Sequence, residues 1–130
     1  MKRILVLSLF SWILLSSVSC RHRLVGTWEV ERYESKAHGQ PTASLRHAGT
    51  LRFHRDYTGE KDLQYTLLGN STWDRIPFRW EASPHKVTLH SQEASEFSKV
   101  WIVVEDRKKR QVWKSTDGSN RVQVLELRKK

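Results

Sequence analysis

The sequence predicts an all-β protein, and more specifically an antiparallel up-and-down β-barrel of about eight strands. Three observations carry this prediction. Apolar and polar residues alternate with period two over short segments, turn-forming residues separate these segments, and no sustained helical stripe occurs. An antiparallel meander of this length removes its exposed edges best by closing into a barrel.

The alternating segments are residues 24–34, 50–55, 63–67, 75–81, 86–90, 99–105, 111–115 and 121–127. Pro77 lacks a backbone N–H, which predicts an edge position or a bulge in its strand. The alternation changes phase between Val124 and Leu125, which predicts a second bulge. Residues 35–48 form a polar connection that is long enough to cover one mouth of the barrel as a lid.

Residues 1–19 have the organisation of a secretory signal peptide. Lys2 and Arg3 precede an apolar run over residues 4–15, and small residues lead to Cys20, the single cysteine of the chain. The run is shorter than the roughly 20 apolar residues that cross a bilayer. We therefore expect residues 20–130 to form one mature β-barrel domain.

The segment that ends at Cys20 resembles the lipobox of bacterial lipoproteins. The resemblance implies that Cys20 receives a diacylglyceryl thioether with palmitate-like chains and becomes the new N-terminus. Arg21, which follows it, implies by the same resemblance the outer membrane, with the protein facing the periplasm. The alternative is the cleavage site of an ordinary exported protein, which would leave an unpaired thiol in an oxidising compartment.

Gly26-Thr27-Trp28, at the entry to the first strand, resembles the lipocalin signature. Together with the pattern from Gly49 to Gly59 and with Phe78-x-Trp80, it is similar to short lipocalin-like domains of Gram-negative lipoproteins. The resemblance implies that Trp28 closes one end of the barrel beneath a ligand cavity. It also implies an arginine over this tryptophan, for which Arg128 is the candidate.

Inward-facing aromatic residues are the candidate ligand-binding residues of this barrel. An eight-stranded barrel either fills its interior with side chains or holds one small ligand, so these residues are also candidate core. They are Trp28, Phe53, Tyr65, Phe78 and Trp80.

The formal net charge is +9, and Arg107-Lys108-Lys109-Arg110 is its densest run. This run is either a docking patch for anionic lipid or polysaccharide, or a solvated hairpin tip. Positive charge also suits nucleic acid, but export makes a nucleic-acid partner unexpected.

Catalytic motifs are absent from the sequence. None of the six histidines has the spacing of a metal-ligand pair, and no nucleophile elbow, carboxylate pair or phosphate loop occurs. We therefore expect a non-enzymatic protein without metal or cofactor that binds a small apolar or amphipathic molecule. The alternative is a structural or partner-binding subunit of a cell-envelope assembly.

Overall fold

The computed structural model describes residues 23–67, 69–116 and 120–130. These residues form strands, turns and irregular connections, and among them no helix is long and apolar enough to cross a membrane. The strands in chain order are β1 (Gly26–Ala37), β2 (Ala43–Phe53), β3 (Thr58–Leu67), β4 (Asn70–Asp74), β5 (Phe78–Ala82), β6 (Lys86–His90), β7 (Val100–Asp106), β8 (Arg110–Thr116) and β9 (Arg121–Lys129).

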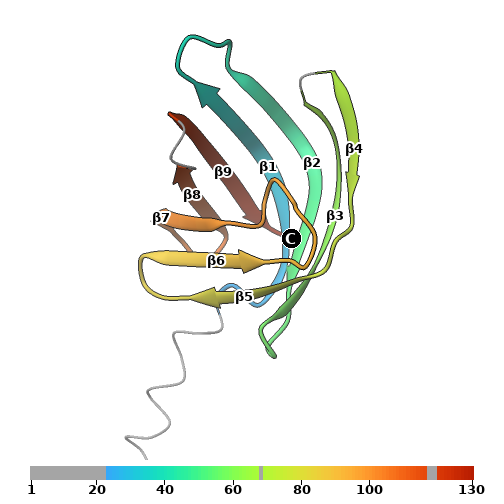
Figure 1. Ribbon diagram of the computed structural model, residues 1–130. Helices are drawn as coiled ribbons and strands as arrows, with labels where there is room; N and C mark the ends of the chain where they lie inside the picture. Colours follow the sequence, from blue (N-terminus) through green and yellow to red (C-terminus); the bar gives the residue numbers. More distant parts are fainter. Residues whose placement is uncertain (1–22, 68, 117–119) are drawn as a thin grey trace, which may run out of the picture.

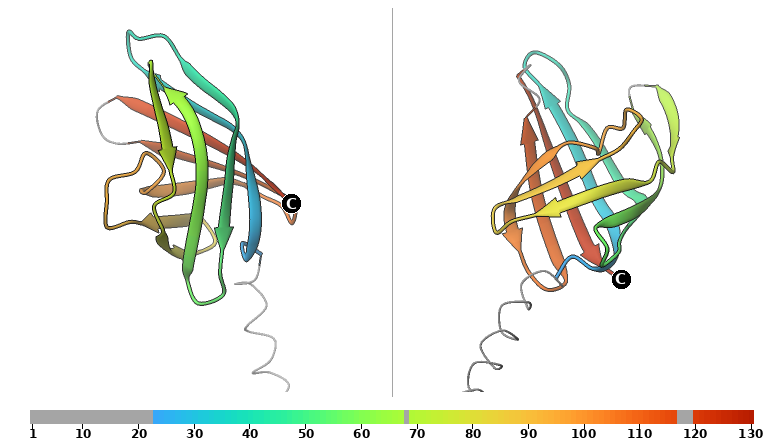
Figure 2. Two further views of the ribbon diagram at one scale, coloured as in Figure 1. Left: turned by 90° about the vertical axis from the view of Figure 1, so that its right-hand side faces the viewer. Right: turned by 60° about the horizontal axis from the view of Figure 1, so that its bottom comes forward.

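Eight of these strands close into an antiparallel ring (Figures 1 and 2). The order around the ring is β2-β1-β9-β8-β7-β6-β5-β3, and β3 pairs back with β2. Strands that follow one another in the chain are neighbours in the ring, except that β9 closes on β1 and the chain passes through β4 between β3 and β5. The predicted up-and-down barrel is confirmed.

The strand β4 branches from the ring because β3 has two partners on one edge. The start of β3 pairs with β5, with Gly59 opposite Phe78, whereas its end pairs with β4, with Leu63 opposite Asp74. Pro77 lies between β4 and β5, where its lack of a backbone N–H does not interrupt strand pairing. The prediction of a strand over residues 75–81 is therefore wrong for residues 75–77.

The two ends of the barrel differ in which segments they collect. The β2–β3, β5–β6 and β7–β8 turns lie at one end with Arg23 and Lys130, and we call this the Trp28 end (Figure 2). The β1–β2, β6–β7 and β8–β9 connections lie at the other, which we call the Phe97 end. Each is named for a fully buried residue near its closure.

The lid expected over residues 35–48 does not exist as a loop. β1 continues to Ala37 and β2 begins at Ala43, so a long hairpin with a short turn replaces the connection. Most polar residues of this hairpin are exposed or half-buried, whereas Ser35 is buried and accepts a hydrogen bond from Arg121 at 2.7 Å. The irregular segment that reaches over the Phe97 end is instead residues 91–99, between β6 and β7.

Two glycines are fixed by close approaches within the ring. A Cβ at Gly49, which has φ +135°, would lie 2.0 Å from the carbonyl oxygen of Asp62 on β3. A Cβ at Gly59 would lie 2.2 Å from the ring of Phe78. Gly59 is therefore required for packing, whereas the residue of the β2–β3 turn in the left-handed conformation is Tyr57, with φ 66°.

The bulge expected in the last strand is wrong. The pairing of β9 with β8 runs without a break through Val124 and Leu125. The phase stays constant because Gln123 is buried and Val124 faces outward, the reverse of what their polarity suggests. The register shifts lie in β1, between Val30 and Arg32, and in β7, between Val103 and Glu105.

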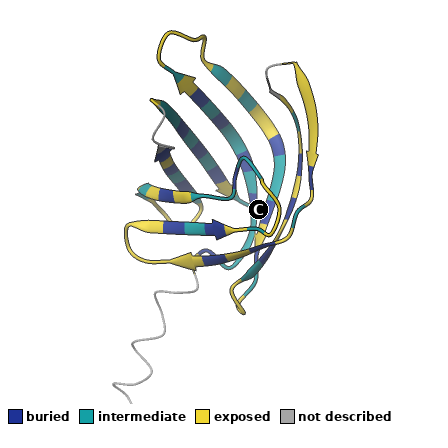
Figure 3. Cartoon of the chain, in the orientation of Figure 1, coloured by how far each residue is buried: buried dark blue, intermediate teal, exposed yellow. Residues whose placement is uncertain are grey.

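Burial alternates along the strands and gathers in the interior (Figure 3). On β9, for example, Gln123, Leu125 and Leu127 are buried and the residues between them are more exposed. One continuous apolar cluster results, rich in tryptophan and phenylalanine.

Candidate functional site

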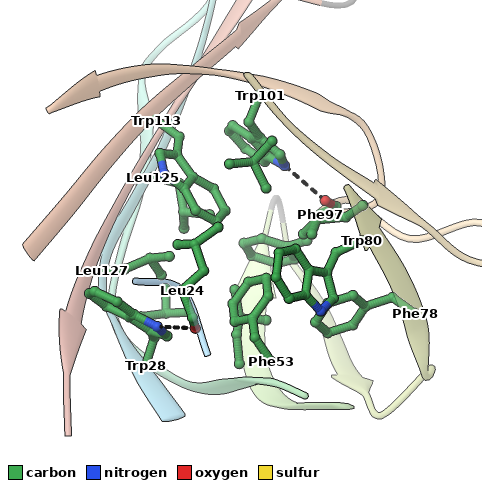
Figure 4. Packing of buried hydrophobic residues seen from close by; sticks show 14 of the residues in the cluster. Leu24, Trp28, Phe53, Phe78, Trp80, Phe97, Trp101, Trp113, Leu125 and Leu127 are labelled. Carbon is green, nitrogen blue, oxygen red and sulfur yellow. Dashed lines mark hydrogen bonds between the residues drawn. The ribbon is translucent and has the colours of Figure 1, made fainter. Parts of the chain in front are cut away.

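The middle of the barrel is filled by aromatic rings around Phe53 (Figure 4). The ring centroid of Phe53 lies 5.3 Å from that of Phe78, 5.5 Å from Trp80 and 6.2 Å from Trp113, each in an edge-to-face arrangement. Such pairs stabilise by about 0.5–1.5 kcal/mol beyond the area they bury. The structure thus brings together three of the expected ligand-binding residues, and it packs them against one another.

Trp28 closes the barrel at its own end, in the position that the sequence predicted. Its side chain is fully buried, and its Nε1 donates a hydrogen bond to the carbonyl oxygen of Leu24 at 2.8 Å (Figure 4). The cation above its ring is Lys129, with Nζ 5.5 Å from the centroid. The assignment of Arg128 is wrong, because this neighbour points outward and approaches Glu29 at 3.8 Å.

Tyr65 lies apart from the other expected ligand residues, towards the Phe97 end. Its ring contacts Phe97 at 5.7 Å between centroids, and Tyr33 contacts the same ring at 4.9 Å. Trp101 Nε1 donates to the carbonyl oxygen of Phe97 at 3.0 Å (Figure 4). Phe97 was missed by the sequence analysis, although it is the single large apolar residue within residues 91–99.

A buried ion pair holds this connection in place. Lys61 Nζ lies 3.2 Å from Asp74 Oδ2, and both side chains are almost completely excluded from solvent. Lys61 donates to the Ser95 hydroxyl at 2.6 Å, and Ser95 donates to Asp74. Burial lowers the pKa of Lys61, whereas the Asp74 carboxylate acts against this shift. The lysine serves as a hydrogen-bond donor here, so the cluster anchors the connection.

A second polar cluster surrounds Glu96 in the same connection. The Tyr33 hydroxyl donates to Glu96, and Arg121 and Lys99 approach this carboxylate at 3.7 and 4.0 Å. Burial and the hydrogen bond to Glu96 raise the pKa of Tyr33 above its usual value. The Phe97 end is therefore sealed by one apolar ring within two sets of polar contacts.

The Trp28 end holds an apolar crevice of about 520 Å³ beside the filled interior. Trp80 is one of its lining residues, and its Nε1 donates hydrogen bonds to the carbonyl oxygens of Thr58 and His54 at 3.0 and 3.2 Å. Tyr57, 39% exposed, packs on Trp80 with centroids 5.1 Å apart. The remaining lining residues are Arg23, Leu24, Ala82, Ser83, Pro84, Val87, Val103, Asp106 and Gln111.

A larger and shallower groove of about 910 Å³ lies along the outside of the β4–β5 bend. Its lining is rich in charged and titratable side chains, including Glu60, Arg75, Arg79 and Glu93. This composition suits water better than an apolar molecule. The end crevice is the better candidate because its walls are mainly apolar and include the aromatic side chains of Tyr57 and Trp80.

The basic run occupies the exposed β7–β8 turn and the start of β8. Arg107 and Arg110 approach Glu105 at 2.9 and 3.1 Å, and the hydrogen bond that Arg110 donates to Glu105 raises the pKa of Arg110. Lys108 and Lys109 are exposed, and no carboxylate of the described residues lies within 4.0 Å of either. Two of the four cations are thus available to a partner.

Cys20, the expected lipidation site, lies outside the described residues. Within the part of the chain that the structure describes, no group of three or more histidine, cysteine or carboxylate side chains could hold a metal ion. Comparison of the sequence with protein-family models and with curated proteins gave no match.

Proposed function

We propose that this protein is a lipid-anchored, non-enzymatic protein of the cell envelope that binds a small amphipathic molecule. The anchor is Cys20, acylated after removal of residues 1–19 as in lipocalin-like lipoproteins. In this proposal the protein is anchored in the outer membrane and its barrel lies in the periplasm. The observation that carries the binding function is the mainly apolar crevice at the Trp28 end, which Trp80 helps to line.

The filled middle of the barrel supports a ligand site in the crevice and not in the interior. Phe53, Phe78, Trp80 and Trp113 occupy the space that a carrier of the lipocalin kind would leave open. The crevice beside them falls within the roughly 300–1,000 Å³ range of small-molecule sites. An apolar wall with the Arg23–Asp106 ion pair at its rim suits an amphipathic molecule better than a purely apolar one.

Blocking the crevice without touching the core tests this function. Ala82 is exposed and lines the crevice, so Ala82→Arg should place a large charged side chain in it. We expect this variant to bind an apolar fluorophore such as N-phenyl-1-naphthylamine at least tenfold more weakly, with unchanged thermal stability. Ala94→Arg, at an exposed position in the β6–β7 connection, is the matched control. Equal binding by both variants, or no saturable binding by the wild type, would argue against the crevice.

The anchor is tested separately by fractionation of the host cell. Cys20→Ala removes the acylated atom, so the protein should leave the membrane fraction. Two acyl chains give stable anchoring, whereas one is marginal. Retention in the membrane fraction to the wild-type extent would refute lipidation.

A second candidate function, binding to an envelope protein, is favoured by the outer face of β7. Val100, Ile102 and Val104 alternate along this strand and are 49%, 53% and 62% exposed. Three outward apolar residues on one strand are typical of a contact surface rather than of a solvated wall. Ile102→Lys should disrupt capture of such a partner while leaving fluorophore binding intact.

A further inference from the structure

Basic residues from separate parts of the chain converge on the Trp28 end. This end collects the β2–β3 turn, the β7–β8 turn and the last residues of β9 (Figures 1 and 2). The backbone N–H of Lys129 donates to the carbonyl oxygen of Lys109 at 2.9 Å, which fixes two basic segments side by side. The basic residues at this end are Arg23, Arg55, Arg107, Lys108, Lys109, Arg128, Lys129 and Lys130.

The described connections of the Phe97 end carry far less positive charge. Its β1–β2 turn, residues 38–42, contains no lysine or arginine, and residues 91–98 contain two glutamates and no basic residue. Arg121 and Lys99, at the margin of this end, lie near Glu96. The positive charge of the loops is therefore concentrated at one end of the barrel.

Several cations at the Trp28 end are free to meet a partner. Arg23 and Arg107 have nearby carboxylates, Asp106 and Glu105. Lys108 and Lys109 project from the turn, and neither has an ion-pair partner among the described residues. The carboxylates at this end are Glu29, Asp56, Glu105 and Asp106, which are fewer than its basic side chains, so the balance stays positive.

The position of Cys20 supplies an independent geometric constraint. Cys20 precedes Arg23 by three residues, and three residues span at most about 10 Å. A lipid on Cys20 would hold the Trp28 end about one Debye length from the headgroups, where charges still interact.

We propose that the Trp28 end is a docking surface for a membrane rich in anionic phospholipid, with Lys108 and Lys109 at its centre. The orientation of the barrel rests on the proposed anchoring at Cys20, whereas the affinity for the lipid surface does not. The anchor keeps the surface close to headgroups, and this favours lipid over a free anionic polysaccharide.

The test uses a protein of residues 21–130, which carries no acyl chain. The closed ring and its core are built from residues 24–130, so this protein retains the whole barrel. Sedimentation with vesicles of phosphatidylglycerol and phosphatidylethanolamine should show binding at about 0.1 M salt and little at about 1 M. Vesicles of phosphatidylcholine alone should not bind it.

A charge-matched pair of variants locates the surface. Each lysine near an anionic membrane strengthens binding by about fivefold, so Lys108→Gln/Lys109→Gln should weaken it more than tenfold. Lys36→Gln/Lys114→Gln removes two exposed lysines on the outer wall and should change it less than twofold. Circular dichroism should show the same folded state for both.

Three outcomes would overturn the docking surface: equal loss in both double variants, equal binding to zwitterionic vesicles, or retention on dextran sulfate without vesicle binding. None of them bears on acylation of Cys20 or on the crevice, because the protein lacks the anchor and the fluorophore assay contains no membrane. Failure of the docking surface and failure of the proposed function are thus distinguishable.

Discussion

The Trp28 end and the Phe97 end place a large aromatic ring in comparable positions but hold it by different means. Trp28 belongs to β1, which pairs with β2 on one side and β9 on the other. Phe97 belongs to the connection between β6 and β7 and depends on side-chain contacts at Lys61, Asp74 and Glu96.

This difference indicates which buried rings are held by the backbone of the barrel and which are held only by side-chain contacts. A residue in a ring strand is fixed by the ladders that close the barrel, so its side chain has no alternative position. A residue in a connection is fixed only as firmly as its polar contacts.

Truncation of the two rings should have unequal consequences. Trp28→Ala should lower the free energy of unfolding by about 3–5 kcal/mol, because the surrounding strands cannot collapse into the cavity. Phe97→Ala should cost less, about 3 kcal/mol or below, because its connection can shift inward. Urea denaturation of both variants measures the difference. If Trp28→Ala lowered the free energy of unfolding less than Phe97→Ala, the expected difference between the two ends would be wrong.

Removal of one partner of the ion pair under the Phe97 end should destabilise the protein strongly, whereas removal of both charges should destabilise it little. Asp74→Asn leaves Lys61 buried without its carboxylate and should cost about 3 kcal/mol. Adding Lys61→Met should recover most of that loss, because no buried charge remains. In Asp74→Asn alone, burial lowers the pKa of Lys61, so stability should rise as pH increases past the folded-state value. Additive losses in the double variant would contradict this coupling.

Alkaline pH should weaken the Phe97 end before the Trp28 end. Burial raises the pKa of Tyr65 to about 12 and that of Tyr33 also above the ordinary value of 10.0. A raised folded-state pKa gives stability that is present below pH 10 and is lost as pH rises beyond it. Urea denaturation across this range should show the decline, and Tyr33→Phe should make it shallower. The same slope in both proteins would exclude Tyr33 as its source.

The sequence predicted the closed ring because period-two alternation and turn residues are local properties. It also placed Trp28 correctly, since Gly26-Thr27-Trp28 marks the entry to the first strand. It could not place Phe97, because a single apolar residue among serines and glutamates has no periodicity to reveal its direction. The lid failed for a related reason: residues 35–48 are polar, and polarity does not distinguish a loop from a hairpin exposed to water.

Two other features depended on contacts that the sequence does not contain. Phe53, Phe78 and Trp80 pack against one another, and Trp113 from β8 packs on Phe53, so these rings fill the interior instead of lining a cavity. The buried position of Gln123 could not be foreseen either, since polarity placed it outside.

The smallest predicted effect separates Lys129 from Arg128 at the Trp28 end. Lys129 lies over the ring of Trp28, and cation–π contacts at partly exposed sites contribute about 0.5–1 kcal/mol. Arg128 is 61% exposed and 3.8 Å from Glu29, a geometry that contributes close to zero once solvent screening is included. Lys129→Gln should therefore lower stability measurably in urea, and Arg128→Gln should not. Because both variants lose one charge from the same end, a general electrostatic effect would shift them equally. A larger loss for Lys129→Gln assigns the effect to the contact with Trp28, and equal losses would contradict that assignment.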